Sequence, residues 1–152
     1  MTTRSAEHAT FTIEREYPAS PARVFRAWAD PAAKAKWFAG PAAWREHRRD
    51  MDFRVGGREH LSGGPAGEPP HVFDAVYLDI VPEARIVYAY DMHIGDRRIS
   101  VSLATVELKP AGRGTRLAFT EQVVFLDGYA DGGSRERGTR GLLEQLAAAL
   151  AA

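Results

Sequence analysis

A glutamate stands among the apolar residues of one predicted strand. In residues 117–128 (LAFTEQVVFLDG), every second side chain shares a face, and that face carries Leu117, Phe119, Glu121, Val123 and Phe125. A buried carboxylate without a partner is costly, so Glu121 should pair with a cation, be held neutral or face a cavity. We favour an ion pair with an arginine. The alternative is a ligand anchor or general base in a cavity.

A second carboxylate and an arginine occupy similar positions. Glu59 shares a strand face with Leu61, and Arg49 shares one with Met51. The two glutamates could act as an acid–base pair in one cavity. They could equally share Arg49 in a buried ionic cluster, which we favour because isolated charges do not persist in a core.

Tyrosines and serines on neighbouring segments could extend such a site. Tyr88 and Tyr90 share a face with Ile86. A pair of tyrosines offers apolar area and hydroxyl donors to a ring-bearing ligand, or simply packs across strands. Ser100 and Ser102 line a cavity or face solvent, depending on which face of their strand is the inner one.

Three arginines occur in the stretch 134–140 (SRERGTR), where the last helix is expected to begin. Cations at the start of a helix oppose its dipole. We therefore expect ion pairs with Asp127, Asp131 or Glu136, or an acidic ligand at this position.

The composition excludes several classes of function. Lys and Arg together number 20, as do Asp and Glu, so no nucleic-acid partner is predicted. The chain has no cysteine, and its five histidines lack the spacing of metal ligands, so neither a metal nor another cofactor is expected. No apolar run approaches the roughly 20 residues that span a bilayer, and residues 1–10 lack the apolar core of a signal peptide. We expect a cytoplasmic protein without a membrane partner.

The order of predicted elements indicates one α+β domain over residues 1–152. A strand at 10–17 is followed by two short helices, which begin at Ser20-Pro21 and Asp30-Pro31 and end at Gly40-Pro41. Strand and turn patterns fill residues 44–126, with about six strands and a Gly- and Pro-rich loop expected at residues 62–70. A final helix carries an apolar stripe of Leu142, Leu143, Leu146 and Leu150.

Four segments, in this order, resemble a known family. They are FTIEREYPASPARVFRAWADPAAKAKWF (11–38), DFRVGGR (52–58), IVPEARIVY (80–88) and GTRGLLEQL (138–146). They are similar to the activator-of-heat-shock-protein-90-ATPase homologue family, a branch of the START-like superfamily of polyketide cyclases and lipid-transfer proteins (SRPBCC). The resemblance implies a helix-grip fold. In this fold a curved antiparallel sheet of six to seven strands surrounds a long C-terminal helix and encloses a cavity. Thr139 stands where many members carry tryptophan.

The leading functional hypothesis is binding of a small apolar or aromatic molecule between the sheet and the last helix. The candidate ligand-binding residues are Glu121, Glu59, Arg49, Tyr88, Tyr90, Phe119, Leu142, Leu146 and Trp37. One alternative is a cyclase, dehydratase or hydrolase that uses Glu121 as base, and another is a co-chaperone-like interaction module. Exposed strand edges make a homodimer plausible.

Overall fold

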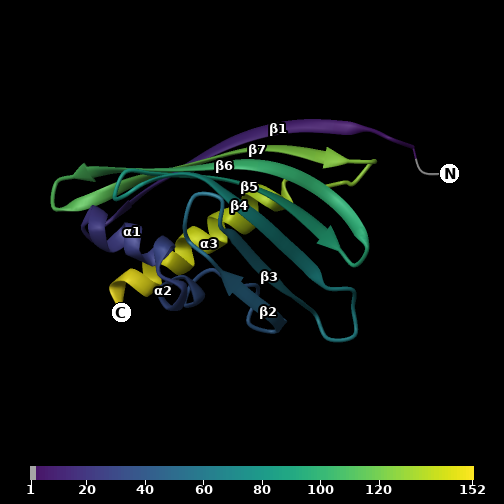
Figure 1. The fold of residues 1–152 in the computed structure, drawn as a ribbon, viewed down its shortest axis with the longest axis horizontal. Helices are drawn as coiled ribbons and strands as arrows, with labels where there is room; N and C mark the ends of the chain where they lie inside the picture. The colour runs from purple at the N-terminus through teal and green to yellow at the C-terminus, as the bar shows by residue number, and fades with distance from the viewer. Residues whose placement is uncertain (1–2) are drawn as a thin grey trace.

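A curved antiparallel sheet and a long helix dominate the computed structural model, which describes residues 3–152 (Figure 1). The strands are β1 (Ala6–Tyr17), β2 (Arg45–Met51), β3 (Arg58–Gly64), β4 (His71–Val81), β5 (Arg85–Ile94), β6 (Arg97–Ala111) and β7 (Gly114–Leu126). The helices are α1 (Pro21–Ala29), α2 (Pro31–Ala35) and α3 (Ser134–Ala151). The predicted helix-grip fold is confirmed.

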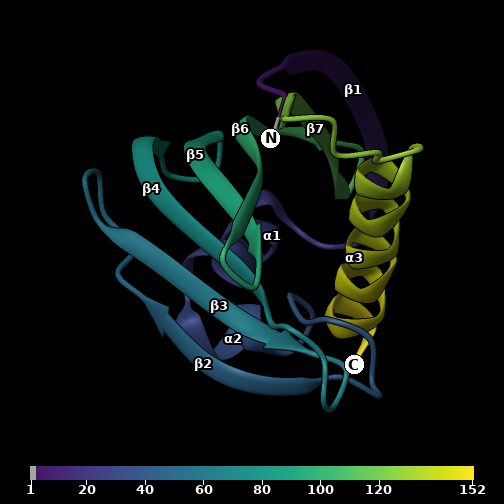
Figure 2. The same ribbon diagram turned by 90° about the vertical axis from the view of Figure 1, so that its right-hand side faces the viewer.

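The sheet order is β1-β7-β6-β5-β4-β3-β2, with every neighbouring pair antiparallel. Consecutive strands from β2 to β7 are neighbours, and β1 adds to β7. The helices α1 and α2 lead the chain from β1 at one edge to β2 at the other. Figure 2 shows that the sheet is curved and that α3 lies across from its concave face. Side chains on the concave face of the sheet therefore point toward α3.

The short helices begin where the sequence predicts. The Ser20 hydroxyl accepts a hydrogen bond from the backbone N–H of Arg23, and Pro21 follows as the first helical residue. Asp30 caps α2 in the same way through the N–H of Ala33. The helix α2 ends at Ala35, earlier than predicted, and tight backbone hydrogen bonds to the carbonyl of Lys34 form the turn that follows.

Strand boundaries differ from the predictions at two places. The first strand begins at Ala6 rather than at residue 10, because its N-terminal half pairs with β7 as far as Leu126. The strand β3 continues to Gly64, although residues 62–70 were expected to form a loop. A Cβ atom at Gly63 would clash with the carbonyl oxygen of Arg45, so glycine permits this close pairing of β2 and β3.

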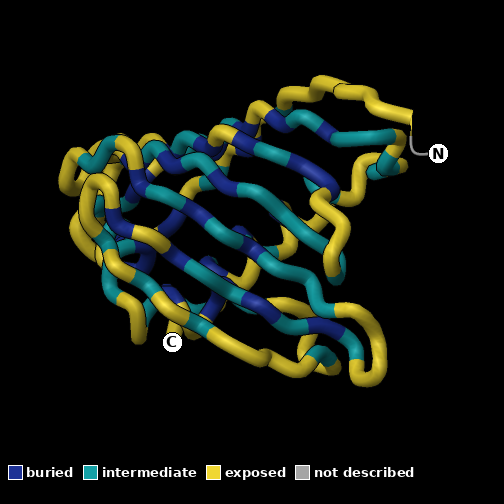
Figure 3. Tube along the Cα trace, turned by 45° about the vertical axis from the view of Figure 1, so that its right-hand side comes forward, coloured by how far each residue is buried: buried dark blue, intermediate teal, exposed yellow. Residues whose placement is uncertain are grey.

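The predicted inner face of β7 is confirmed. Leu117, Phe119, Glu121, Val123 and Phe125 are all buried, whereas the residues between them are more accessible. Figure 3 shows this alternation of buried and accessible positions along several strands. On α3 the buried leucines are Leu143, Leu146 and Leu150, and Leu142 is half-buried. None of the helices described in residues 3–152 has the length and apolar character needed to cross a membrane.

Candidate functional site

A cavity of about 730 Å³ lies between the concave face of the sheet and α3. Its wall is mainly apolar and aromatic, with contributions from Trp28, Trp37, Phe38, Phe73, Tyr88, Tyr90 and Phe119. Neighbouring rings contact one another: Phe73 and Tyr90 have centroids 4.8 Å apart, and those of Trp28 and Trp37 are 4.7 Å apart. The volume and the apolar lining are typical of small-molecule sites.

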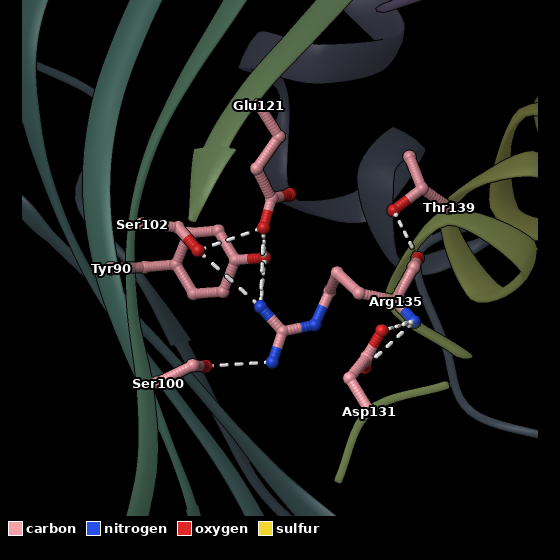
Figure 4. A network of polar contacts seen from close by, with 7 residues as sticks. All are labelled: Tyr90, Ser100, Ser102, Glu121, Asp131, Arg135 and Thr139. Carbon is pink, nitrogen blue, oxygen red and sulfur yellow. Dashed lines mark hydrogen bonds and ion pairs between the residues drawn. The ribbon is translucent and has the colours of Figure 1, made fainter. Parts of the chain in front are cut away.

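Glu121 lies in the wall of this cavity at the centre of a polar cluster drawn from three adjacent strands. Tyr90 on β5 is opposite Ser102 on β6, and Ser102 lies diagonally across from Glu121 on β7. Both hydroxyls donate to the Oε2 atom of Glu121 at 2.7 Å (Figure 4). The open question about β6 is thus settled: its serine face is the inner one, because Ser100 and Ser102 are buried.

The cation of the cluster comes from α3. Arg135 Nη1 lies 3.1 Å from Glu121 Oε2, and Arg135 Nη2 donates to the Ser100 hydroxyl at 2.7 Å. The guanidinium also lies 5.7 Å from the ring centroid of Tyr90. The side chain of Glu121 is 1% exposed and that of Arg135 is 13% exposed. The predicted pair of Glu121 with an arginine is confirmed. We refer to Glu121, Tyr90, Ser100, Ser102 and Arg135 as the Glu121 cluster.

Asp131 holds Arg135 in place at the start of α3. The N-cap residue Gly133 has no side chain to accept a hydrogen bond, but the carboxylate of Asp131 accepts from the backbone N–H of Arg135 at 3.1 Å. Of the ion pairs expected in the basic stretch 134–140, that of Glu136 is present. Asp131 supplies an acidic group next to the helix start, and Glu136 pairs with Arg140 at 2.9 Å.

One oxygen of Glu121 is left without a partner. Its Oε1 atom is buried and has no hydrogen bond within the described part of the chain. The indole Nε1 of Trp28, another residue of the cavity wall, is buried and unpaired in the same way. A buried polar group without a partner costs about 1–3 kcal/mol, and more when it is charged.

Glu59 belongs to a different ionic cluster. Its Oε1 accepts from the Lys34 ammonium at 2.6 Å and from the Tyr77 hydroxyl at 2.5 Å. The Lys34 ammonium also lies 4.4 Å from the ring centroid of Phe38. Burial lowers the pKa of Lys34, although the charge of Glu59 opposes this shift. Neither Lys34 nor Glu59 lines the cavity, so this pair is part of the core.

The hypothesis that Arg49 is shared by the two buried glutamates is wrong. Its guanidinium donates to the carbonyl of Phe38 and to the carboxylate of Glu46, each at 2.7 Å. Arg49 is therefore held at the edge of the sheet on β2, where Glu46 is a nearby and more accessible partner. The buried glutamates each have their own cation, Lys34 and Arg135.

Six of the nine predicted ligand-binding residues lie in the wall of the cavity. They are Trp37, Tyr88, Tyr90, Phe119, Glu121 and Leu142, whereas Glu59, Arg49 and Leu146 do not line it. The predicted set does not include Arg135, although this residue belongs to the basic stretch 134–140. Trp28, Phe38 and Phe73 were also missed. No group of three or more potential metal ligands occurs among residues 3–152.

The buried tyrosines predict a loss of stability at high pH. Burial raises the pKa of Tyr17 from 10.0 to about 12, and burial also raises the pKa values of Tyr77, Tyr88 and Tyr90. These tyrosines ionise more readily in the unfolded chain, so their stabilising effect is complete below about pH 10 and declines as the pH rises above that value. For Tyr17 the effect is lost as the pH rises through about 12. Tyr17 should therefore contribute part of the decline between about pH 10 and about pH 12.

Urea unfolding at several pH values between 8 and 12 measures this effect. The Tyr17→Phe variant should show a shallower decline than the unmodified protein. The lowered pKa of Lys34 makes the unfolding free energy rise with pH up to about pH 10.5. This effect opposes that of the tyrosines, but it comes from one group, whereas four tyrosines contribute to the decline. A constant unfolding free energy up to pH 12 would contradict the expectation.

Comparison with known proteins places this arrangement in a family. The family model described as "Activator of Hsp90 ATPase homolog 1-like protein" matches residues 18–152. The chain belongs to this family. A protein from Rhizobium leguminosarum with the same fold is 52% identical, has a TM-score of 0.94, and is aligned over 98% of each chain.

Two further solved structures are similar to this member of the Activator of Hsp90 ATPase homolog 1-like family. A protein from Rhizobium loti is 50% identical, with a TM-score of 0.89 over 95% of this chain and 99% of that one. A protein from Chromobacterium violaceum is 29% identical, with a TM-score of 0.76 over 93% of this chain and 96% of that one. A comparison with curated proteins gave no match.

Proposed function

We propose that this protein binds a small molecule with an apolar or aromatic body in the cavity between the sheet and α3. The observation that carries the proposal is the cavity itself, about 730 Å³ in volume and walled largely by aromatic side chains. Pockets for small molecules combine an apolar wall with a few placed polar groups. The Glu121 cluster supplies those groups on one side of the cavity.

Two glycines of α3 support this proposal. Gly138 and Gly141 line the cavity, and a Cβ atom added at either position would meet no atom within 4 Å. Glycine inside a helix is less favourable than alanine by about 1 kcal/mol. Packing does not require glycine at these positions. Both glycines are exposed, so a side chain at either position would extend from the cavity wall where the cavity meets solvent.

A large side chain at Gly141 is therefore expected to block ligand uptake without unfolding the protein. Gly141→Phe should weaken binding of a neutral aromatic probe, N-phenyl-1-naphthylamine, by about tenfold or more, because the ring occupies space that the ligand needs. The melting temperature should stay the same or rise, since a helical glycine has been replaced. Fluorescence titration of the probe and thermal unfolding measure the two effects.

Ala148→Phe provides the matched control. Ala148 is exposed on the same helix and does not line the cavity, so probe affinity should not change. Native mass spectrometry of the protein purified without denaturant provides an independent test, because it detects a retained compound. Absence of probe binding, or equal affinity in both phenylalanine variants, would contradict the proposed function.

A further inference from the structure

The unpaired oxygen of Glu121 identifies the polar group that a ligand must present. Glu121 is 1% exposed, and its Oε2 atom accepts from Tyr90, Ser102 and Arg135. The Oε1 atom has no donor within residues 3–152, although the side chain lies in the cavity wall. In Figure 4 this second oxygen points away from the Arg135 guanidinium, toward the side on which Thr139 lies.

The neighbouring side chains do not supply the missing donor. The Thr139 hydroxyl donates to the backbone carbonyl of Arg135 at 3.0 Å. The Tyr90 and Ser102 hydroxyls are already directed at Oε2. Because a buried carboxylate oxygen is stabilised by a donor, a group that enters the cavity with an O–H or N–H complements this atom.

The guanidinium of Arg135, in contrast, already has hydrogen-bond partners within the protein. Arg135 Nη1 faces Glu121, Tyr90 and Ser102, and Arg135 Nη2 donates to Ser100. An anionic ligand at this position would approach the Glu121 carboxylate and would have to replace these contacts. The local arrangement therefore favours a neutral donor over a carboxylate or phosphate.

A hydroxyl group fits the cavity better than a group that only donates. Trp28 lines the same cavity, and its buried Nε1 is a donor without a partner among residues 3–152. Trp28 packs against Phe119, with ring centroids 6.4 Å apart, and Phe119 shares the inner face of β7 with Glu121. A hydroxyl both donates and accepts, so it is complementary to each of the two kinds of unpaired group.

We infer that the ligand is a neutral aromatic or apolar alcohol or phenol whose hydroxyl donates a hydrogen bond to Glu121 Oε1. This inference rests on the proposed binding function and specifies the class of compound. In this arrangement Glu121 is a binding residue, and Arg135 positions it. The aromatic wall holds the body of the ligand.

Three naphthalene probes that differ in one substituent test the inference. They are 2-naphthol, which has a hydroxyl; 2-methoxynaphthalene, which can only accept; and 2-naphthoate, which is anionic. At a pH of about 7, 2-naphthol should bind the full-length protein about tenfold or more tighter than either of the others, because hydrogen bonds to charged groups are strong. Equilibrium dialysis gives the three dissociation constants.

Glu121→Gln replaces the acceptor at the Oε1 position with a donor. The amide oxygen should turn toward the Tyr90, Ser102 and Arg135 donors, and the amide NH₂ should then occupy the position of Oε1. The preference for 2-naphthol over 2-methoxynaphthalene should fall to about twofold or less. Glu107→Gln, the same change at an exposed residue on the outer face of β6, should keep the preference of the unmodified protein.

The outcomes separate this inference from the proposed function. Equal binding of 2-naphthol and 2-methoxynaphthalene, or tightest binding of 2-naphthoate, would overturn the assignment of a hydroxyl but leave ligand binding intact. Failure of all three probes to bind would overturn both. A preference that persists in Glu121→Gln would overturn the role of Glu121.

A crystal structure of the unmodified protein with 2-naphthol tests the same contact without any variant, should Glu121→Gln fail to fold. The expected result is the probe hydroxyl within hydrogen-bond distance of Glu121 Oε1. A water molecule in that place, with the hydroxyl elsewhere, would overturn the inference.

Discussion

Lys34→Met is expected to lower the free energy of unfolding by about 3–5 kcal/mol, because it leaves the carboxylate of Glu59 buried without a cation. The side chains of Lys34 and Glu59 are 2% and 3% exposed, so water cannot replace the lost ammonium. Tyr77 would still donate to Glu59, but one neutral hydroxyl does not compensate a buried charge. Urea unfolding followed by circular dichroism measures the loss.

A second substitution should recover much of that stability. In Lys34→Met/Glu59→Gln, no charge remains at the site, and the glutamine oxygen can still accept from Tyr77. Arg48→Met serves as the control, because its pair with Asp50 is 67% and 57% exposed and should contribute less than about 1 kcal/mol. A double variant as unstable as Lys34→Met alone would show that the cost arises from lost packing, not from the unpaired charge.

Alternation along the strands made the inner face of β7 predictable from the sequence. Glu121 stood out because a two-residue period placed it between Phe119 and Val123, and the structure buries all three. The same period left β6 undecided, since both of its faces carry apolar residues. Only pairing with β5 and β7 determines that Ser100 and Ser102 face inward.

The partners of the buried glutamates were harder to predict, because ion pairs form between residues distant in sequence. Arg135 reaches Glu121 only through the path of the loop before α3, which a sequence pattern does not specify. A local signal did exist for Lys34. It precedes Trp37 by three residues and Phe38 by four, a spacing that places a cation on the apolar side of a helical turn.

The boundary of the cavity likewise depends on tertiary structure. Leu142 lines the cavity, whereas Leu146, one turn further along the same predicted stripe, packs in the core. Helical periodicity identifies the side of α3 that is buried, but it does not distinguish contact with a cavity from contact with filled core. For the same reason, Glu59 and Glu121 looked alike in sequence but occupy different environments.

Arg135→Met is expected to destabilise the protein by about 3 kcal/mol, somewhat less than Lys34→Met. Both substitutions leave a buried carboxylate without its cation. The side chain of Arg135 is 13% exposed, against 2% for Lys34, so its removal opens a path by which water reaches Glu121. The Tyr90 and Ser102 hydroxyls remain as donors to the same carboxylate. Thermal and urea unfolding compare the two variants directly.

Glu121→Gln should lower the free energy of unfolding less than Arg135→Met does, and this order tests which group needs the other. The glutamine keeps an acceptor for Tyr90 and Ser102, and the Arg135 charge left behind retains some contact with the cavity and its solvent. The double variant Arg135→Met/Glu121→Gln should therefore regain much of the stability lost in Arg135→Met, because it removes the buried charge that has no cation. A larger loss of unfolding free energy in Glu121→Gln than in Arg135→Met would contradict this order. It would show that the charge of Glu121 is stabilising without Arg135, so that Arg135 is not its main compensation.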